Sequence, residues 1–171
     1  MESRVKIFGH PVHPMLIVFP VGLFAAAVVF DILYLIVRNS VFPTVSFYMI
    51  ATGVIGGLLA AIFGLIDWLG LPSNSRAKSI GGWHGLGNLT IVILFAVSWF
   101  LRRGDPNLIP TTLALVLSFA GILMALVTAW IGGELVYRLG VGVDPGANVN
   151  APSSLSNEPA SRTDQRRTVN R

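Results

Sequence analysis

Long apolar runs separated by short polar segments dominate this chain. The runs lie at about residues 15–37, 45–69, 82–101 and 111–137. Each is long enough to cross roughly 30 Å of hydrocarbon as a helix, and none shows the alternation typical of a half-buried strand. Because the connections between the runs are short, consecutive helices should be antiparallel. The pattern predicts an all-α membrane protein, a four-helix transmembrane up-and-down bundle.

The composition supports this prediction and divides the chain in two. Of the 171 residues, 53% are hydrophobic and 12% are charged, which is more apolar surface than a soluble domain of this size buries. We expect a transmembrane domain over residues 1–143. Residues 144–171 are rich in Asn, Ser, Pro and Arg, which predicts a polar, disordered tail. The chain has no cysteine, which excludes disulfides, thiolate metal sites and covalently attached haem.

The basic residues predict an orientation in the membrane. More of them flank the side of the termini (Arg4, Lys6, Arg76, Lys78 and Arg138) than the other side (Arg38, Arg102 and Arg103). The positive-inside rule then places both termini in the cytoplasm, with the bundle in the inner membrane. Topology and contact with membrane lipid account for the net charge of +4, so nucleic acid is not an expected partner.

Small residues recur at four-residue spacing in the second and fourth spans. Such stripes let helix backbones approach closely, so we expect these two spans to form the closest pair, or the stripes to support a homo-oligomer. The stripes are Gly53, Gly57 and Ala61, and Gly121, Ala125, Ala129 and Gly133.

Ionisable side chains gather at one level of the predicted bundle. Threading the spans up and down places five of them near one membrane face: His10, His13, Asp67, His84 and Glu134. Imidazoles and carboxylates suit a transition metal ion, and two imidazoles on different helices suit b-type haem. The five are therefore candidate metal ligands, and His10, His13 and His84 are candidate haem ligands. The alternative is an interfacial hydrogen-bonded network without a cofactor.

Prolines should shape the start of the first span. A residue before proline disfavours the α region, so we expect His10 and His13 to lie in a rigid turn and not on one helix face. Asp31 lies about 27 Å along the helix from His13, towards the opposite membrane face. Its simplest role is pairing with Arg38, Arg102 or Arg103 near that interface, and the alternative is a place in a proton path.

Three classes of function remain open. The first is a metal- or haem-binding protein that serves a redox partner. The second is a small carrier that couples to a cation or proton, and the third is a membrane anchor or assembly factor. An enzyme is less expected, because the sequence contains no cysteine nucleophile, no recognisable pairing of serine with a base and no phosphate loop.

Four short blocks resemble a known family. They are GHPVHPMLIVFPVGL, GLIDWL, WHGLGN and IGGELVYRLGVGV, within residues 8–143. Together they are similar to a bacterial family of predicted four-helix membrane proteins, domain of unknown function 2231. The resemblance implies a membrane location and a four-helix core. It implies no activity and no site residue, although members occur beside redox domains.

Overall fold

The computed structural model describes residues 1–156 and 158–162, which form four long helices with a small hairpin before them. In chain order the elements are β1 (Lys6–Ile7), β2 (His10–Pro11), α1 (Val12–Val37), α2 (Val41–Leu69), α3 (Arg76–Arg102), α4 (Thr112–Gly133) and a π-helical segment, η1 (Glu134–Arg138). All four spans predicted from the sequence are present as helices that are long and apolar enough to cross a membrane. The four-span fold class is therefore confirmed.

Three helices begin before the apolar runs do, since α1 begins at residue 12, α2 at residue 41 and α3 at residue 76. In α3 and α4 a side-chain hydroxyl caps the first turn. The first turn of α3 follows Ser75, whose hydroxyl accepts a hydrogen bond from the backbone N–H of Lys78 at 3.1 Å. The hydroxyl of Thr111 caps α4 in the same way through the N–H of Ala114 at 3.2 Å. Such caps satisfy amide groups that the helix itself leaves free.

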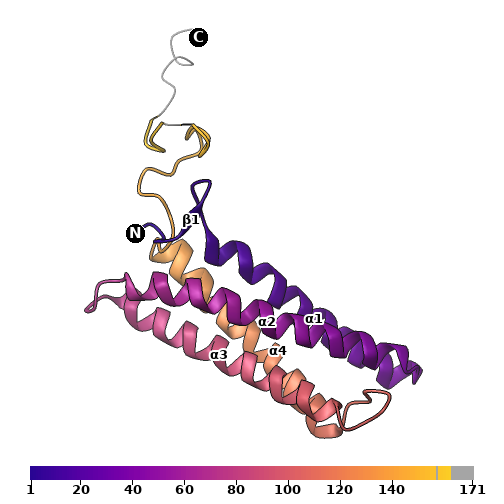
Figure 1. Cartoon of the computed structure of the whole chain (residues 1–171). Coiled ribbons are helices and arrows are strands. Elements are labelled where there is room, and N and C mark those ends of the chain that lie inside the picture. The colour runs from indigo at the N-terminus through magenta and orange to yellow at the C-terminus, as the bar shows by residue number, and fades with distance from the viewer. Residues whose placement is uncertain (157, 163–171) are drawn as a thin grey trace.

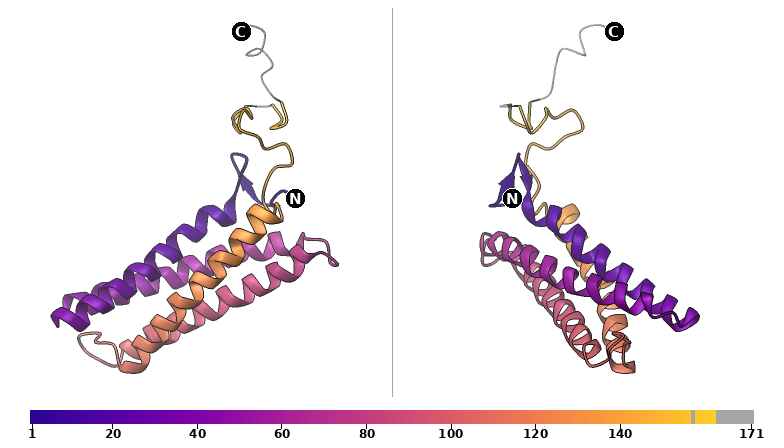
Figure 2. Two further views of the ribbon diagram at one scale, coloured as in Figure 1. Left: turned by 180° about the vertical axis from the view of Figure 1, so that it is seen from behind. Right: turned by 45° about the vertical axis from the view of Figure 1, so that its right-hand side comes forward.

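The bundle consists of two helical hairpins. α1 packs along α2, and α3 packs along α4, as both views of Figure 2 show. The expectation that the second and fourth spans form the closest pair is wrong, since α2 packs on α1 and α3 and α4 packs on α3 and α1. Gly53 and Gly121 instead face the aromatic rings of Phe24 and Phe95, on α1 and α3.

Burial in the bundle follows the pattern expected for a protein surrounded by lipid. Val18 and Leu126 are 65% and 66% exposed on the outer surface, where hydrocarbon would cover them. At the centre the rings of Phe24 and Phe95 stack, with centroids 4.0 Å apart. The fully buried polar side chains include Asp31 and Arg102, so these two charged side chains are turned inward.

The N-terminal hairpin and the chain that follows η1 lie at one end of the bundle (Figure 1). There β1 and β2 form an antiparallel pair, and the chain beyond η1 passes beside it (Figure 1). The described part of the tail is irregular, and Ser154 lies against Gly9 of the β turn. Residues 157 and 163–171 of the predicted disordered tail lie outside the described residues.

The structure confirms that His10 and His13 do not share a helix face, and it corrects the expectation that both lie in a turn. His10 lies in β2, whereas His13 lies in the first turn of α1, which begins at Val12. A proline disfavours the helical conformation of the residue before it, but this steric preference can be overcome. Pro14 needs no amide partner in a first turn, and a hydrogen bond from the His13 ring to α2 holds this turn in place.

Candidate functional site

Two half-buried imidazoles lie between helices near the end of the bundle that carries the β1–β2 hairpin (Figure 1). His13 of α1 places Nδ1 at 2.9 Å from the carbonyl oxygen of Ala60 in α2. His84 of α3 places Nδ1 at 3.0 Å from the carbonyl oxygen of Thr128 in α4. A carbonyl only accepts hydrogen bonds, so both rings carry a proton on Nδ1. Each imidazole thus joins the two helices of its hairpin and presents an unprotonated Nε2 when neutral.

Glycines make room for the two rings. A Cβ at Gly64 would lie 2.8 Å from Cε1 of His13, and a Cβ at Gly132 would lie 3.0 Å from Cε1 of His84. The distance at Gly64 is too short for a side chain unless the ring shifts, and the distance at Gly132 is tighter than most Cβ contacts, so each ring packs closely against a glycine.

Nε2 of His84 already has a hydrogen-bond partner. The amide group of Asn88, one turn along α3, donates to Nε2 of His84 at 3.0 Å and to the carbonyl of the same residue at 2.9 Å. This contact agrees with the Nδ1-protonated form of His84, in which Nε2 is an acceptor. A ligand at Nε2 of His84 would have to displace the Asn88 amide.

The other three residues predicted for the site make separate contacts. His10 is exposed, and its Nδ1 lies 3.1 Å from the carbonyl of Phe8. Asp67 accepts hydrogen bonds from Ser3 and from the backbone N–H of Arg4, each at 2.8 Å.

Glu134, at the start of η1, pairs with Arg76 at 2.7 Å. Across residues 1–156 and 158–162, no three histidine or acidic side chains are grouped so that they could hold a metal ion. The five residues predicted to lie at one level of the bundle therefore do not form one common site in the described residues.

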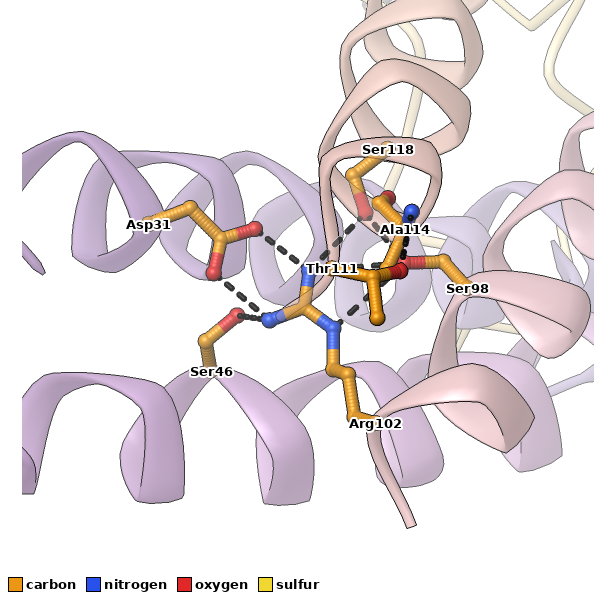
Figure 3. Close-up of polar contacts among 7 residues, drawn as sticks. All are labelled: Asp31, Ser46, Ser98, Arg102, Thr111, Ala114 and Ser118. Carbon is orange, nitrogen blue, oxygen red and sulfur yellow. Dashed lines mark hydrogen bonds and ion pairs between the residues drawn. The ribbon is translucent and has the colours of Figure 1, made fainter. Parts of the chain in front are cut away.

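A second polar centre lies deep in the bundle, towards the opposite end. The guanidinium of Arg102 in α3 donates to both carboxylate oxygens of Asp31 in α1, at 2.7 and 2.6 Å (Figure 3). Both side chains are 0% exposed. The sequence-based prediction that Asp31 pairs with one of three arginines is confirmed for Arg102, the last residue of α3, and both side chains are buried among the helices.

Three serine hydroxyls complete the surroundings of this ion pair. Ser46 of α2, Ser98 of α3 and Ser118 of α4 accept hydrogen bonds from Arg102 at 3.1 to 3.4 Å. The hydroxyl of Ser98 also donates to the carbonyl of Ala114 at 2.7 Å. A buried charge is tolerated in such a place only when it is paired and hydrogen-bonded. Contacts from all four helices meet here, as Figure 3 shows.

These serines were absent from the sequence-based site. The sequence offers only one indication of their role. Each serine lies in its span at about the same depth as Asp31 or Arg102. Serines are common in membrane helices for packing alone, so that level does not distinguish them.

The geometry defines a class of protein: a four-span membrane bundle with a central buried ion pair and two helix-joining imidazoles. The family comparison is more specific. The model for predicted membrane proteins described as DUF2231 matches residues 9–145. The chain belongs to this family. No curated protein and no solved structure matches the chain.

Proposed function

We propose that this protein binds b-type haem through His13 and His84 and acts as an electron-transfer subunit in the membrane. The observation that carries the proposal is the orientation of the two rings, in which Nδ1 is hydrogen-bonded to a backbone carbonyl. Histidines that ligate metals commonly donate their other ring N–H in this way, which fixes the ring and leaves Nε2 for the metal. Two such rings on facing helices suit the two axial positions of haem iron.

Haem fits the available residues better than a metal ion with carboxylate ligands. Asp67 is occupied by Ser3 and the N–H of Arg4, and Glu134 is paired with Arg76. Two imidazoles alone make an incomplete set for a tetrahedral or octahedral ion, whereas haem supplies four nitrogens of its own.

Absorption spectroscopy tests the proposal. The full-length protein, expressed with a haem precursor and purified in detergent, should show the Soret and α bands of bis-imidazole haem and should take up added hemin in a 1:1 ratio. His13→Ala and His84→Ala should abolish these bands, and His10→Ala is the matched control that retains them. Asn88→Ala should tighten hemin binding, because no amide then competes for Nε2 of His84.

Two results would contradict the proposal. One is wild-type protein that stays colourless after hemin is added. The other is hemin binding that His13→Ala and His84→Ala leave unchanged. Metal analysis of the same preparations distinguishes a transition metal ion, which would leave the Soret region empty.

A second candidate function is that of a membrane anchor or assembly protein without a cofactor. It is favoured by the same hydrogen bonds, since each imidazole joins the two helices of a hairpin. In that case His13→Ala and His84→Ala would lower the stability of colourless protein. We also propose that the bundle lies in the inner membrane with both termini in the cytoplasm, which a C-terminal phosphatase or fluorescent-protein topology reporter would test.

A further inference from the structure

The first helices of the two hairpins repeat the same residues at the same spacing. In each, a phenylalanine follows the histidine by 11 positions, and a charged residue follows the phenylalanine by 7. These residues are His13, Phe24 and Asp31 in α1, and His84, Phe95 and Arg102 in α3. The matching segments around the phenylalanines read VGLFAA and VILFAV.

The second helices repeat in the same manner. Small residues lie at intervals of 7 and 4 positions, as Gly53, Ala60 and Gly64 in α2 and as Gly121, Thr128 and Gly132 in α4. The partners across each hairpin also correspond. A Cβ at Gly53 would lie 2.6 Å from the Phe24 ring, and one at Gly121 would lie 2.7 Å from the Phe95 ring.

Contacts between equivalent residues mark a pseudo-two-fold axis. The rings of Phe24 and Phe95 stack on each other at an angle of 3°, and Asp31 pairs with Arg102. In each case a residue meets its own counterpart from the other hairpin. Because α1 and α3 both start at the end that carries the termini (Figure 1), the axis runs along the bundle.

We infer that the chain is two copies of one helical hairpin joined covalently, and that the opposite charges of Asp31 and Arg102 make each hairpin pair with the other type and not with its own. Two N-terminal hairpins would bury one Asp31 against another. Two C-terminal hairpins would bury two guanidinium groups together. Since both positions are 0% exposed, neither like pair could be relieved by water.

The surroundings of the pair support this specialisation. Ser98 and Ser118 hydrogen-bond to Arg102, and their counterparts in the first hairpin are Ala27 and Ile50. Hydroxyl acceptors therefore surround the cation, whereas apolar groups occupy the equivalent places beside the anion. The hairpin interface thus recognises a hairpin of complementary charge, which a second copy of this chain could also supply.

Full-length charge variants test which hairpins can pair. Asp31→Arg gives a chain with two arginines at the axis, and Arg102→Asp gives a chain with two aspartates. Each variant alone should lose the folded monomer in detergent. When the two are co-expressed with different tags they should copurify as an exchanged dimer, because hairpins swapped between the chains restore one Asp–Arg pair at each axis.

A disulfide locates the contact in that dimer. A Cβ at Gly57 would lie 2.9 Å from Cγ2 of Val92, across the hairpin interface, and the chain has no cysteine of its own. Gly57→Cys in the Arg102→Asp chain and Val92→Cys in the Asp31→Arg chain, which together keep Asp31 opposite Arg102, should therefore form an intermolecular disulfide under mild oxidation. The same two cysteines placed in one otherwise unchanged chain should cross-link within the chain, as the positive control.

Each outcome decides the inference. Copurification and the intermolecular disulfide support it when differently tagged copies of the same variant give neither. Variants that fold as monomers like the wild type overturn it, because the charges would then not decide the pairing. Failure of the co-expressed pair to exceed the same-variant controls also overturns it.

Discussion

Replacing one member of the buried ion pair should cost far more than replacing both. Asp31 and Arg102 are 0% exposed and joined at 2.6 Å, so removing either leaves a charge in a medium of low dielectric. Breaking a buried pair in this way costs about 3–5 kcal/mol, whereas well-packed apolar replacements of both partners are often neutral or stabilising. We expect Asp31→Leu to lower the free energy of unfolding by about 4 kcal/mol.

The two single variants should differ in a definite direction. After Asp31→Leu, the guanidinium of Arg102 keeps its serine acceptors but stays charged, because arginine does not lose its proton in proteins. After Arg102→Leu, the carboxyl group of Asp31 can become neutral by taking up a proton. Arg102→Leu should therefore cost less than Asp31→Leu, about 3 kcal/mol. The double variant should lie within about 1 kcal/mol of the wild type.

The assay is unfolding in mixed micelles, followed by loss of helix signal as a denaturing detergent is added. The four proteins form a double-mutant cycle, and the expected coupling energy between positions 31 and 102 is about 7 kcal/mol from the costs above. Additivity within about 0.5 kcal/mol would refute the reasoning. It would mean that the two side chains do not meet in the folded protein.

Three smaller changes test other contacts. Gly121→Ala should cost about 1–3 kcal/mol by overpacking, because its Cβ would lie 2.7 Å from an aromatic ring; Gly22→Ala, with nothing within 4 Å, should be neutral or stabilising in the same unfolding assay. Asp67→Asn should weaken the contacts that hold residues 3 and 4, seen as faster amide hydrogen exchange there and unchanged exchange in α3. Glu134→Gln should change stability by less than about 1 kcal/mol, since its partner Arg76 is 61% exposed, and a larger loss would show that the pair is shielded from solvent.

The fold could be predicted from the sequence because its strongest signal is one-dimensional. Length and hydropathy identify a membrane span without any tertiary information, so all four helices were predicted, with errors at their ends. The first turn of α3 escaped this signal because residues 76–81 are mostly polar or small. Its helical state depends on the cap by Ser75, which hydropathy does not report.

The site was predicted less well because height along a helix is not enough to define it. Threading places His13, Asp67 and Glu134 at one level, but the rotation of each helix decides which side chains meet. In spans that are apolar on every face, the hydrophobic pattern carries little information about that rotation. For the same reason the sequence limited the partner of Asp31 to three arginines and could not select Arg102.

The two polar levels of the bundle impose opposite demands on equivalent residues. At the level of His13 and His84, both hairpins carry an imidazole bonded to a backbone carbonyl, and neutral imidazoles can lie near each other without a large electrostatic cost. At the level of Asp31 and Arg102, identical charges a few ångströms apart in a low dielectric would repel by several kcal/mol. Equal residues are therefore compatible with the first level, and only unequal ones with the second. A covalently joined pair of hairpins satisfies both demands in one chain. The two copies can carry different residues at positions 31 and 102, and both can keep the histidine that a ligand shared on the axis would require.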